Sequence, residues 1–211
     1  MADGRSLPTP GVRAARTLQT RAGIVEACRR LIRSGGNVNM PAVAHAAGVS
    51  EATAYRHFAD LVTLINQSLT ELWPSPAEAL APVADSVDAA DRVGYACEFL
   101  LRQSNQYLGA VRAVIAATVT RPTVVPTRPG FRFGLIDQAL DPIFPTIAGN
   151  AADRLHQLKL DLAAVVSVEA FLSLTDLCGL SVEDAMGSLV RTARTITDVA
   201  MRNIEALGGN S

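Results

Sequence analysis

The sequence contains few of the residues that form disulfide frameworks, metal sites and most catalytic centres. Among its 211 residues only three are cysteine and three are histidine. Cys28, Cys97 and Cys178 lie far apart within apolar helical patterns, so we expect buried thiols in a reducing cytoplasm. His45 and His156 are predicted to be surface or packing residues, not ligands. The small number of cysteine and histidine residues predicts a protein without a metal site or a cofactor.

Catalytic motifs and long apolar runs are also missing. There is no glycine-rich phosphate loop, no His-Glu-x-x-His and no Gly-x-Ser-x-Gly sequence, the motifs of several large enzyme classes. Residues 160–180 are the most apolar later stretch, but Asp161, Glu169 and Asp176 interrupt it, which argues against a membrane span. No basic start followed by an apolar run opens the chain, so no secretory signal is expected. We predict a cytoplasmic protein that is not an enzyme and has no membrane partner.

The patterns that are present are helical. Apolar residues recur at spacings of three and four along most of the chain, and no alternating strand pattern appears, so the sequence predicts an all-α fold of about nine helices. Proline-rich stretches predict a stiff connection over residues 74–85 and a loop over 121–130. The longer helices are expected at about 17–34, 61–72, 86–103, 107–119, 130–148 with an interruption, 151–178 and 181–207.

Charge is distributed unevenly along the chain. Residues 1–66 carry eight arginines against four carboxylates, a net charge of +4, whereas residues 67–211 carry 11 basic and 16 acidic residues, a net charge of −5. A positive end on a negative body suits a protein of which one end contacts phosphates. The alternative is a local fluctuation of solvated charges.

Residues 39–60 predict two short helices joined by a tight turn. Asn39 is a good N-cap for the first helix, and Ser50 is a good N-cap for the second. Gly48, between them, provides the backbone freedom that a sharp turn needs. Two helices joined by three or four residues that include a glycine form a helix-turn-helix, whose second helix lies in the major groove of DNA.

Small and apolar residues of this segment are expected to hold the second helix against the first. Ala44, Ala47 and Ala52 would allow the two helices to approach closely, while Val49, Ala54 and Phe58 would face inward. The polar residues between them would then remain available to a partner.

The first 64 residues contain a characteristic series of residues in a fixed order and spacing. The series is Thr20, Arg21, Ile24, Ala27, Leu31, Gly35, Val43, Ala44, Ala47, Gly48, Val49, Ser50, Thr53, Tyr55, His57 and Phe58. From Thr20 to about Leu64 it resembles the DNA-binding motif of the TetR (tetracycline-repressor-like) family of transcriptional regulators. The expected organisation is a helix-turn-helix DNA-binding domain over residues 17–66 and a helical effector-binding and dimerisation domain over 67–211. The basic arm over residues 1–16 would contact DNA or remain a solvated tail.

The candidate DNA-contacting residues lie early in the first helix and on the second helix of the motif. Thr53 offers a hydroxyl and a methyl group to base edges, and Arg56 would reach a base or a phosphate. Glu51 would either accept from a cytosine amino group or complement the helix dipole. Thr20, Arg21, Tyr55 and His57 resemble residues with which the family contacts phosphates or groove edges. Ser50 and the free N–H groups at the start of the second helix would bind a phosphate. The full set is Thr20, Arg21, Ser50, Glu51, Thr53, Tyr55, Arg56 and His57.

Two positions depart from the family pattern. Leu61 stands where a lysine commonly contacts a DNA phosphate, so this chain lacks that contact, and its loss is expected to lower the salt dependence of binding by about one unit of slope. Pro41 stands where some members have a base-contacting side chain. The helix before the turn is therefore expected to contribute less to specificity.

The last two predicted helices are candidates for a dimer interface. The first of them is apolar on more than one face and needs cover on two sides. By resemblance, the same helices of a second copy provide that cover; without the resemblance, the interior of a monomer fits nearly as well. The candidate interface residues are Leu158, Leu162, Val165, Met186, Leu189, Ala193, Ile196 and Ala200.

The resemblance also implies a small-molecule effector bound in the helical body. The three phenylalanines among the candidates fit an ordinary core as well. Glu169 falls on an apolar stripe, where a charge indicates a polar pocket wall, a paired interface charge or a misjudged stripe. The candidate effector-binding residues are Phe99, Gln103, Tyr107, Phe131, Phe133 and Glu169.

The sequence therefore predicts a ligand-responsive regulator that binds double-stranded DNA. In its expected form it is a homodimeric repressor of a palindromic operator, and an unidentified small molecule releases it. Two alternatives remain: a helical protein-interaction module that has lost DNA binding, to which Leu61 and Pro41 point, and an enzyme built in the helical body.

Overall fold

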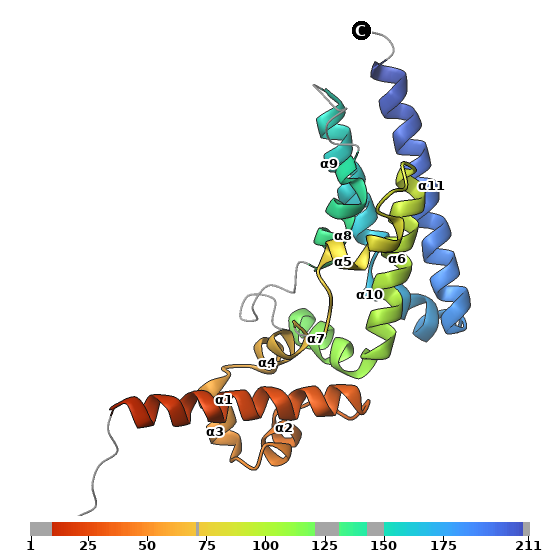
Figure 1. Cartoon of the computed structure of the whole chain (residues 1–211). Coiled ribbons are helices and arrows are strands. Elements are labelled where there is room, and N and C mark those ends of the chain that lie inside the picture. The colour runs from red at the N-terminus through yellow and green to blue at the C-terminus, as the bar shows by residue number, and fades with distance from the viewer. Residues whose placement is uncertain (1–9, 71, 121–130, 143–149, 209–211) are drawn as a thin grey trace, which may run out of the picture. The chain divides into compact units, whose positions relative to one another are not determined.

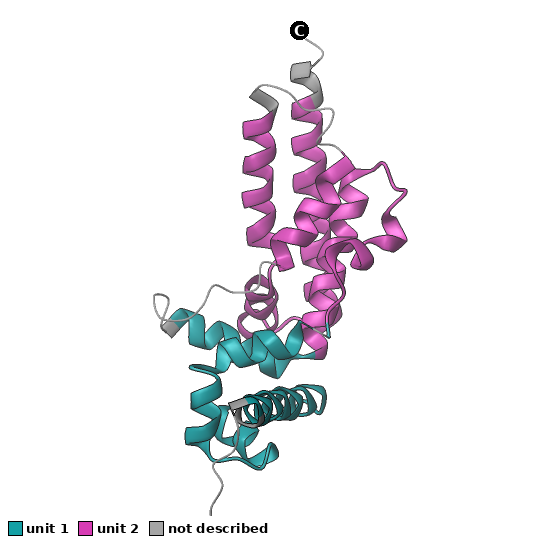
Figure 2. Ribbon diagram, turned by 60° about the vertical axis from the view of Figure 1, so that its left-hand side comes forward, with its two compact units in different colours: residues 1–72, 107–128 teal, residues 73–106, 129–211 magenta. Residues whose placement is uncertain are grey.

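A computed structural model of the chain contains only helices within the part that it describes, residues 10–70, 72–120, 131–142 and 150–208. This confirms the all-α prediction. The helices form two compact units (Figure 2): unit 1 comprises residues 1–72 and 107–128, and unit 2 comprises residues 73–106 and 129–211. No helix in the described ranges is long and apolar enough to cross a lipid bilayer.

Unit 1 is built on the long helix α1, against which α2 and α4 pack (Figure 1). Helix α3 packs on α2, and α7 packs on α4, so a helix from the predicted body joins the N-terminal helices. The core includes Ile24 of α1, Val43 of α2, Phe58 after α3 and Leu64 of α4, all buried. The helices span Pro10–Arg33 (α1), Met40–Ala46 (α2), Glu51–His57 (α3), Leu61–Leu69 (α4) and Leu108–Thr120 (α7).

The first helix is longer than the sequence pattern predicts. It begins at Pro10, so residues 10–16 of the predicted arm are helical, and residues 1–9 lie outside the described ranges. Proline fits the first turn of a helix because the N–H that it lacks would have no partner there. The predicted starting point near residue 17 is therefore wrong.

Unit 2 is built on α6 and α11, which pack side by side, with α9 against α11 and α8 between α6 and α9 (Figure 1). Its core includes Leu101 of α6, Ile136 of α8, Leu162 of α9 and Phe171 of α10, all buried. The elements span Pro76–Ala79 (α5), Ala81–Val83 (η1), Ala89–Gln106 (α6), Phe131–Leu140 (α8), Asn150–Val165 (α9), Val168–Leu172 (α10), Ser173–Leu177 (η3, a π-helical turn) and Val182–Gly208 (α11).

The continuous helix predicted over residues 151–178 is broken after Val165. Ser167 has an extended backbone, with φ of −151°, and its side chain accepts a hydrogen bond from the N–H of Ala170 at 3.1 Å. Serine competes with helix continuation because its hydroxyl can cap a new helix. The segment 74–85 likewise contains α5 and η1, so it is not merely a stiff connection. The predicted loop over 121–130 lies outside the described residues.

A buried arginine ties three segments of unit 2 together. Arg92 of α6 is 3% exposed. Its Nε donates to the carbonyl of Ala139 at 2.8 Å, and Nη2 donates to Gln138 at 2.7 Å, near the end of α8. Nη1 donates to the carbonyls of Val83 and Ala84 at 2.8 and 2.9 Å. A buried cation is costly unless it is well hydrogen-bonded, and here carbonyls that close a helix end, where the dipole is negative, provide the bonds.

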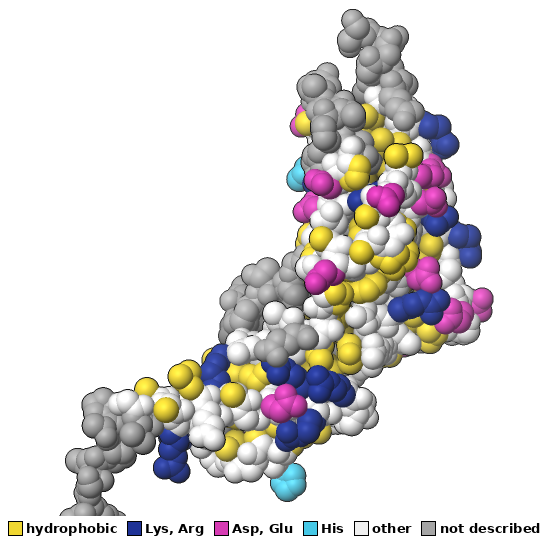
Figure 3. Space-filling view, in the orientation of Figure 1, with side chains coloured by type: hydrophobic (Ala, Val, Ile, Leu, Met, Phe, Trp, Pro, Cys, Tyr) yellow, Lys and Arg dark blue, Asp and Glu magenta, His cyan; other side chains and the backbone are white. Residues whose placement is uncertain are grey.

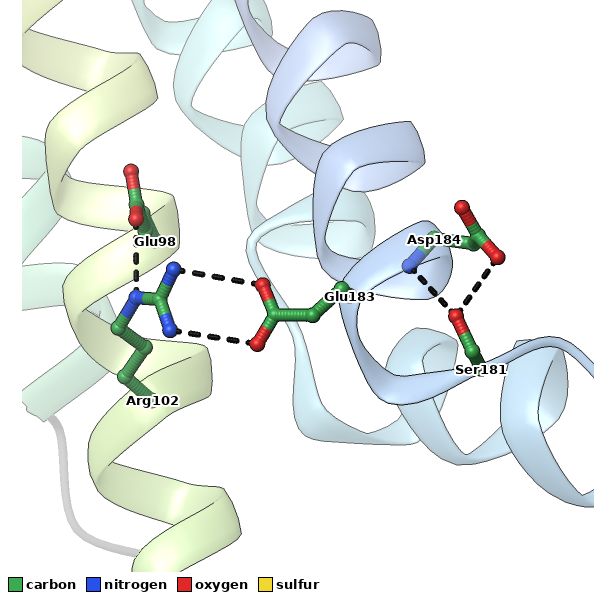
Figure 4. Close-up of polar contacts among 5 residues, drawn as sticks. All are labelled: Glu98, Arg102, Ser181, Glu183 and Asp184. Atoms are coloured by element: carbon green, nitrogen blue, oxygen red, sulfur yellow. Dashed lines mark hydrogen bonds and ion pairs between the residues drawn. The ribbon is translucent and has the colours of Figure 1, made fainter.

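Two further arginines link α6 to α11. Gly94 allows Arg194 to lie across α6, because a Cβ at position 94 would be 2.3 Å from Arg194 Nε. Arg194 then pairs with Asp91 at 3.0 Å. Figure 4 shows the second link: Arg102 Nε donates to Glu98 at 2.9 Å, and its terminal nitrogens lie 3.4 and 3.5 Å from the Glu183 carboxylate.

The surroundings of Arg102 favour its charged form but add little stability. The hydrogen bond to Glu98, followed by the charge of Glu183, raises the pKa of Arg102. Both ion pairs are exposed, and exposed pairs are weak because water screens them. Beside them, Ser181 caps α11 by accepting from the N–H of Asp184 at 3.1 Å (Figure 4).

The three thiols are predicted to differ sharply in reactivity. Cys28 and Cys97 are buried, whereas Cys178 is exposed, so the predicted burial is wrong for Cys178. Burial raises the pKa of Cys97 to about 12 and also raises that of Cys28, and the thiolate is the reactive form. We expect iodoacetamide at pH 8 to alkylate Cys178 alone in the native protein and all three thiols after unfolding, as read by peptide mass spectrometry. Native-state labelling of Cys97 would contradict its burial.

Candidate nucleic-acid interface

The segment that connects α2 to α3 is defined by local hydrogen bonds. Asn39 Oδ1 accepts from the N–H three residues later at 2.9 Å, and Ser50 Oγ does the same at 3.2 Å. Both predicted N-caps are therefore confirmed. Gly48 has a φ of +67°, a left-handed conformation that glycine adopts without steric cost. The α2–turn–α3 segment has the form of a helix-turn-helix.

Helix α3 has one buried face and one exposed face. Ala54 is 0% exposed and Phe58 is 1% exposed, so their predicted inward orientation is confirmed, whereas Val49 is only half-buried. Because successive residues turn about 100° around a helix, Arg56 lies about 200° from Ala54, close to the opposite direction. Arg56 and Ala52 are exposed, and Tyr55 is 50% exposed. Ala52 therefore faces outward and does not bring the two helices together, contrary to the prediction.

Three polar side chains at the start of α3 form a hydrogen-bonded cluster. The hydroxyl oxygens of Ser50 and Thr53 lie 2.9 Å apart, and Arg56 Nη2 donates to Thr53 Oγ1 at 3.0 Å. The Thr53 hydroxyl, predicted to meet base edges, thus already has two partners within the protein. Arg56 uses one N–H in this contact and keeps the rest of its planar fork of donors.

Arg21, a predicted phosphate contact, binds the protein itself. From α1 its Nη1 donates to the carbonyl of His57 at the end of α3, and Nη2 donates to Gln67 Oε1 of α4 at 2.6 Å. Its guanidinium also lies 4.0 Å from the centre of the Phe58 ring, a cation–π contact. These contacts give Arg21 a positioning role, in which it holds α3 against α1 and α4.

The other predicted contact residues lie around the same region. Thr20 is half-buried and its hydroxyl donates to the carbonyl of Arg16 at 2.9 Å. Glu51, the first residue of α3, is exposed, and His57, the last, is half-buried. The structure thus places Ser50 to His57 on one short helix and its cap, with Thr20 and Arg21 on α1.

Charge favours contact of unit 1 with an anion. Unit 1 carries 11 arginines against five carboxylates, a net charge of +6, whereas unit 2 carries eight basic and 15 acidic residues, a net charge of −7. Figure 3 shows dark-blue basic side chains over the helices of unit 1, on the face drawn there. The difference in net charge between the two units is larger than that between residues 1–66 and 67–211, because residues 107–128 add three arginines and no carboxylate to unit 1.

The predicted effector-binding residues are only partly gathered. Phe131 lies 6.3 Å from Phe99 between ring centres, and it meets Trp73 edge-on at 4.8 Å. Glu169 accepts from Ser167 Oγ at 3.1 Å and pairs with Arg132 at 3.5 Å. The helix break at Ser167 removes Glu169 from the apolar stripe that was expected, and an ion pair within the chain satisfies it. Of the others, Phe133 is exposed and its ring centre lies 5.4 Å from the Arg132 guanidinium carbon, Gln103 is half-buried on α6, and Tyr107 falls in unit 1.

Trp73 was not among the predicted residues. Its Nε1 is buried and has no hydrogen-bond partner among the described residues. Two open hollows of about 320 and 340 Å³ occur in unit 2, and no predicted effector residue lines either of them. Within the described ranges, no group of three or more His, Cys, Asp or Glu side chains is placed to hold a metal ion.

The predicted dimer residues require correction. Five of the eight are buried inside the single chain, so they form the core of unit 2 and offer no surface to a second copy; these are Leu158, Leu162, Met186, Leu189 and Ala193. Val165, Ile196 and Ala200 are half-buried. Exposed apolar side chains do occur on the same two helices, at Leu160 of α9 and Val199 of α11, which are 49% and 45% exposed.

Comparisons of the chain with models of protein families, with curated proteins and with solved structures find no match.

Proposed function

We propose that the protein is a DNA-binding transcriptional regulator of the kind that its N-terminal sequence resembles, the TetR family. The observation that carries the proposal is the exposed polar face of α3, on a helix capped by Ser50 and preceded by the left-handed turn at Gly48. A short helix with a polar outer face, held on a positively charged unit, suits insertion into the major groove.

Surface charge and side-chain type support double-stranded DNA as the partner. Tyr55, Arg56 and Glu51 are exposed on a helix that is only seven residues long, and each offers hydrogen bonds to phosphates or base edges. The net charge of +6 on unit 1 attracts a polyanion. The negative charge of unit 2 is unsuited to phosphate contact, which leaves that unit for assembly and for a small-molecule effector.

DNA binding is tested by fluorescence anisotropy on duplexes from the region upstream of the chain's own gene. Tyr55→Ala is expected to weaken binding to every bound duplex by about 1 kcal/mol, or roughly fivefold, because it removes a contact that carries no sequence information. Affinity is expected to fall steeply with salt because binding releases counterions. Arg154→Ala, an exposed arginine of α9, is the control and should leave affinity unchanged.

Two binding results would contradict the proposal. If no duplex binds at low salt, the protein is not a DNA-binding regulator, and the protein-interaction module becomes the better description. If Tyr55→Ala and Arg154→Ala weaken binding equally, general electrostatics and not α3 governs the affinity.

The proposed regulator acts as a homodimer, because two recognition helices are needed to read a palindromic operator. We place the interface on the exposed apolar residues of α9 and α11, in place of the buried residues named from the sequence. Val199→Asp is expected to convert dimers to monomers in sedimentation velocity, since a charge would enter an apolar contact. Val199→Thr, which keeps the shape, should remain dimeric. A dimer that persists in Val199→Asp would exclude this face of α11.

A further inference from the structure

We propose that Arg56 reads a guanine in each half-site of the operator and that Thr53 positions its guanidinium for this contact. The inference rests on the proposed DNA-binding function and assigns the base that the recognition helix prefers. It also reassigns Thr53, which the sequence alone presents as a direct reader of base edges.

The orientation of α3 places Arg56 at the centre of its exposed face. Ala54 and Phe58 mark the buried direction, and Arg56 projects nearly opposite to Ala54. Ala52 lies one turn earlier on the same face and is also exposed. Its methyl group is small, so the backbone of α3 can approach the floor of a groove closely at this point. The side chain at the centre of the exposed face is therefore an arginine, and the residue one turn before it on that face, Ala52, is small.

The hydrogen bond to Thr53 directs the guanidinium toward the start of the helix. Arg56 Nη2 lies 3.0 Å from Thr53 Oγ1, one turn nearer the N-terminus. In helix-turn-helix proteins the N-terminal residues of the recognition helix are the ones that contact base edges. The contact also restricts a long side chain before DNA arrives, so less rotamer freedom is lost on binding.

The hydrogen-bond donors of the Arg56 guanidinium favour guanine over the other bases. Guanine presents two acceptors, N7 and O6, in the major groove, whereas the other bases present at most one acceptor beside a donor or a methyl group. With one N–H committed to Thr53, the guanidinium keeps parallel donors for a bidentate contact. Thr53, in contrast, has its hydroxyl shared between Ser50 and Arg56 at 2.9 and 3.0 Å. A direct contact of this hydroxyl with a base would require both bonds to rearrange.

The test is selection of bound duplexes from a randomised library, followed by sequencing, for the wild-type chain and three variants. Wild type is expected to select a guanine at one fixed position in each half-site. Arg56→Ala should lower the preference for that guanine by at least roughly fivefold and leave the other positions unchanged. Thr53→Val, which keeps the shape and removes the hydroxyl, should weaken the preference at the same position. Thr53→Ser, which keeps the hydroxyl, should preserve it.

Three results would overturn the assignment, and they are distinguishable. If Arg56→Ala weakens all duplexes alike with an unchanged preference profile, Arg56 contacts phosphate. If Thr53→Val changes a different position from Arg56→Ala, Thr53 reads its own base. If wild type selects no duplex at all, the proposed function fails and the guanine assignment fails with it. Thermal unfolding of each variant, followed by circular dichroism, checks that the chain remains folded.

Discussion

Replacing Arg92 with methionine is expected to lower the free energy of unfolding by about 4 kcal/mol, because the carbonyls of two segments then lose a buried, charged donor. Arg92 makes four hydrogen bonds of 2.7–2.9 Å to backbone carbonyls from a site that is 3% exposed. Methionine fills similar space but donates nothing. For a chain of this length the midpoint of thermal unfolding should fall by about 10 °C, as measured by circular dichroism.

Arg102 provides a matched control on the same helix. It also carries a guanidinium with ion-pair partners, but its side chain is 54% exposed. Arg102→Met should therefore change the free energy of unfolding by less than about 1 kcal/mol. If the two substitutions lowered the free energy of unfolding equally, the effect would come from the loss of positive charge on α6. The buried hydrogen bonds of Arg92 to the carbonyls would then add no stability of their own.

Arg21→Met is expected to impair both stability and DNA binding. It removes the hydrogen bonds to the His57 carbonyl and to Gln67, together with the cation–π contact with Phe58. The loss of these contacts together is expected to lower the free energy of unfolding by about 2 kcal/mol. Because α3 loses its anchor at its C-terminal end, affinity for all duplexes should fall by roughly tenfold or more. Urea unfolding and anisotropy measure the two effects.

The same variant separates the two roles considered for Arg21. A phosphate contact would predict unchanged stability and a salt dependence lower by about one unit of slope. Arg16→Met removes the same charge from an exposed position of α1 and is the control for long-range electrostatics. A stable Arg21→Met variant with a reduced salt slope would restore the phosphate role.

Signals confined to a few neighbouring residues were readable from the sequence. The caps at Asn39 and Ser50 are confirmed, since each is a side chain that accepts from an N–H three residues later. The left-handed glycine between α2 and α3 is likewise a local requirement. The class of fold follows from helical periodicity, which depends on sequence spacing alone.

Features that depend on distant partners were not readable. Arg21 meets Gln67, 46 residues away, and Arg92 meets Ala139, 47 residues away; no spacing rule links such pairs. The prediction of the dimer-interface residues was wrong for a related reason. Helical periodicity identifies an apolar face, but it cannot tell whether the chain's own helices or a second copy will cover that face. For Leu158 and Leu162 the cover is internal.

The close approach of Arg194 to Gly94 has a consequence for the evolution of unit 2. Any side chain larger than hydrogen at position 94 would meet the guanidinium and push it away from Asp91. A lineage that acquires alanine at position 94 would thus gain from a shorter residue at position 194, and one that keeps the present pairing of Arg194 with Asp91 is expected to keep the glycine. The two sites, 100 positions apart in the chain, are expected to be inherited as a matched pair.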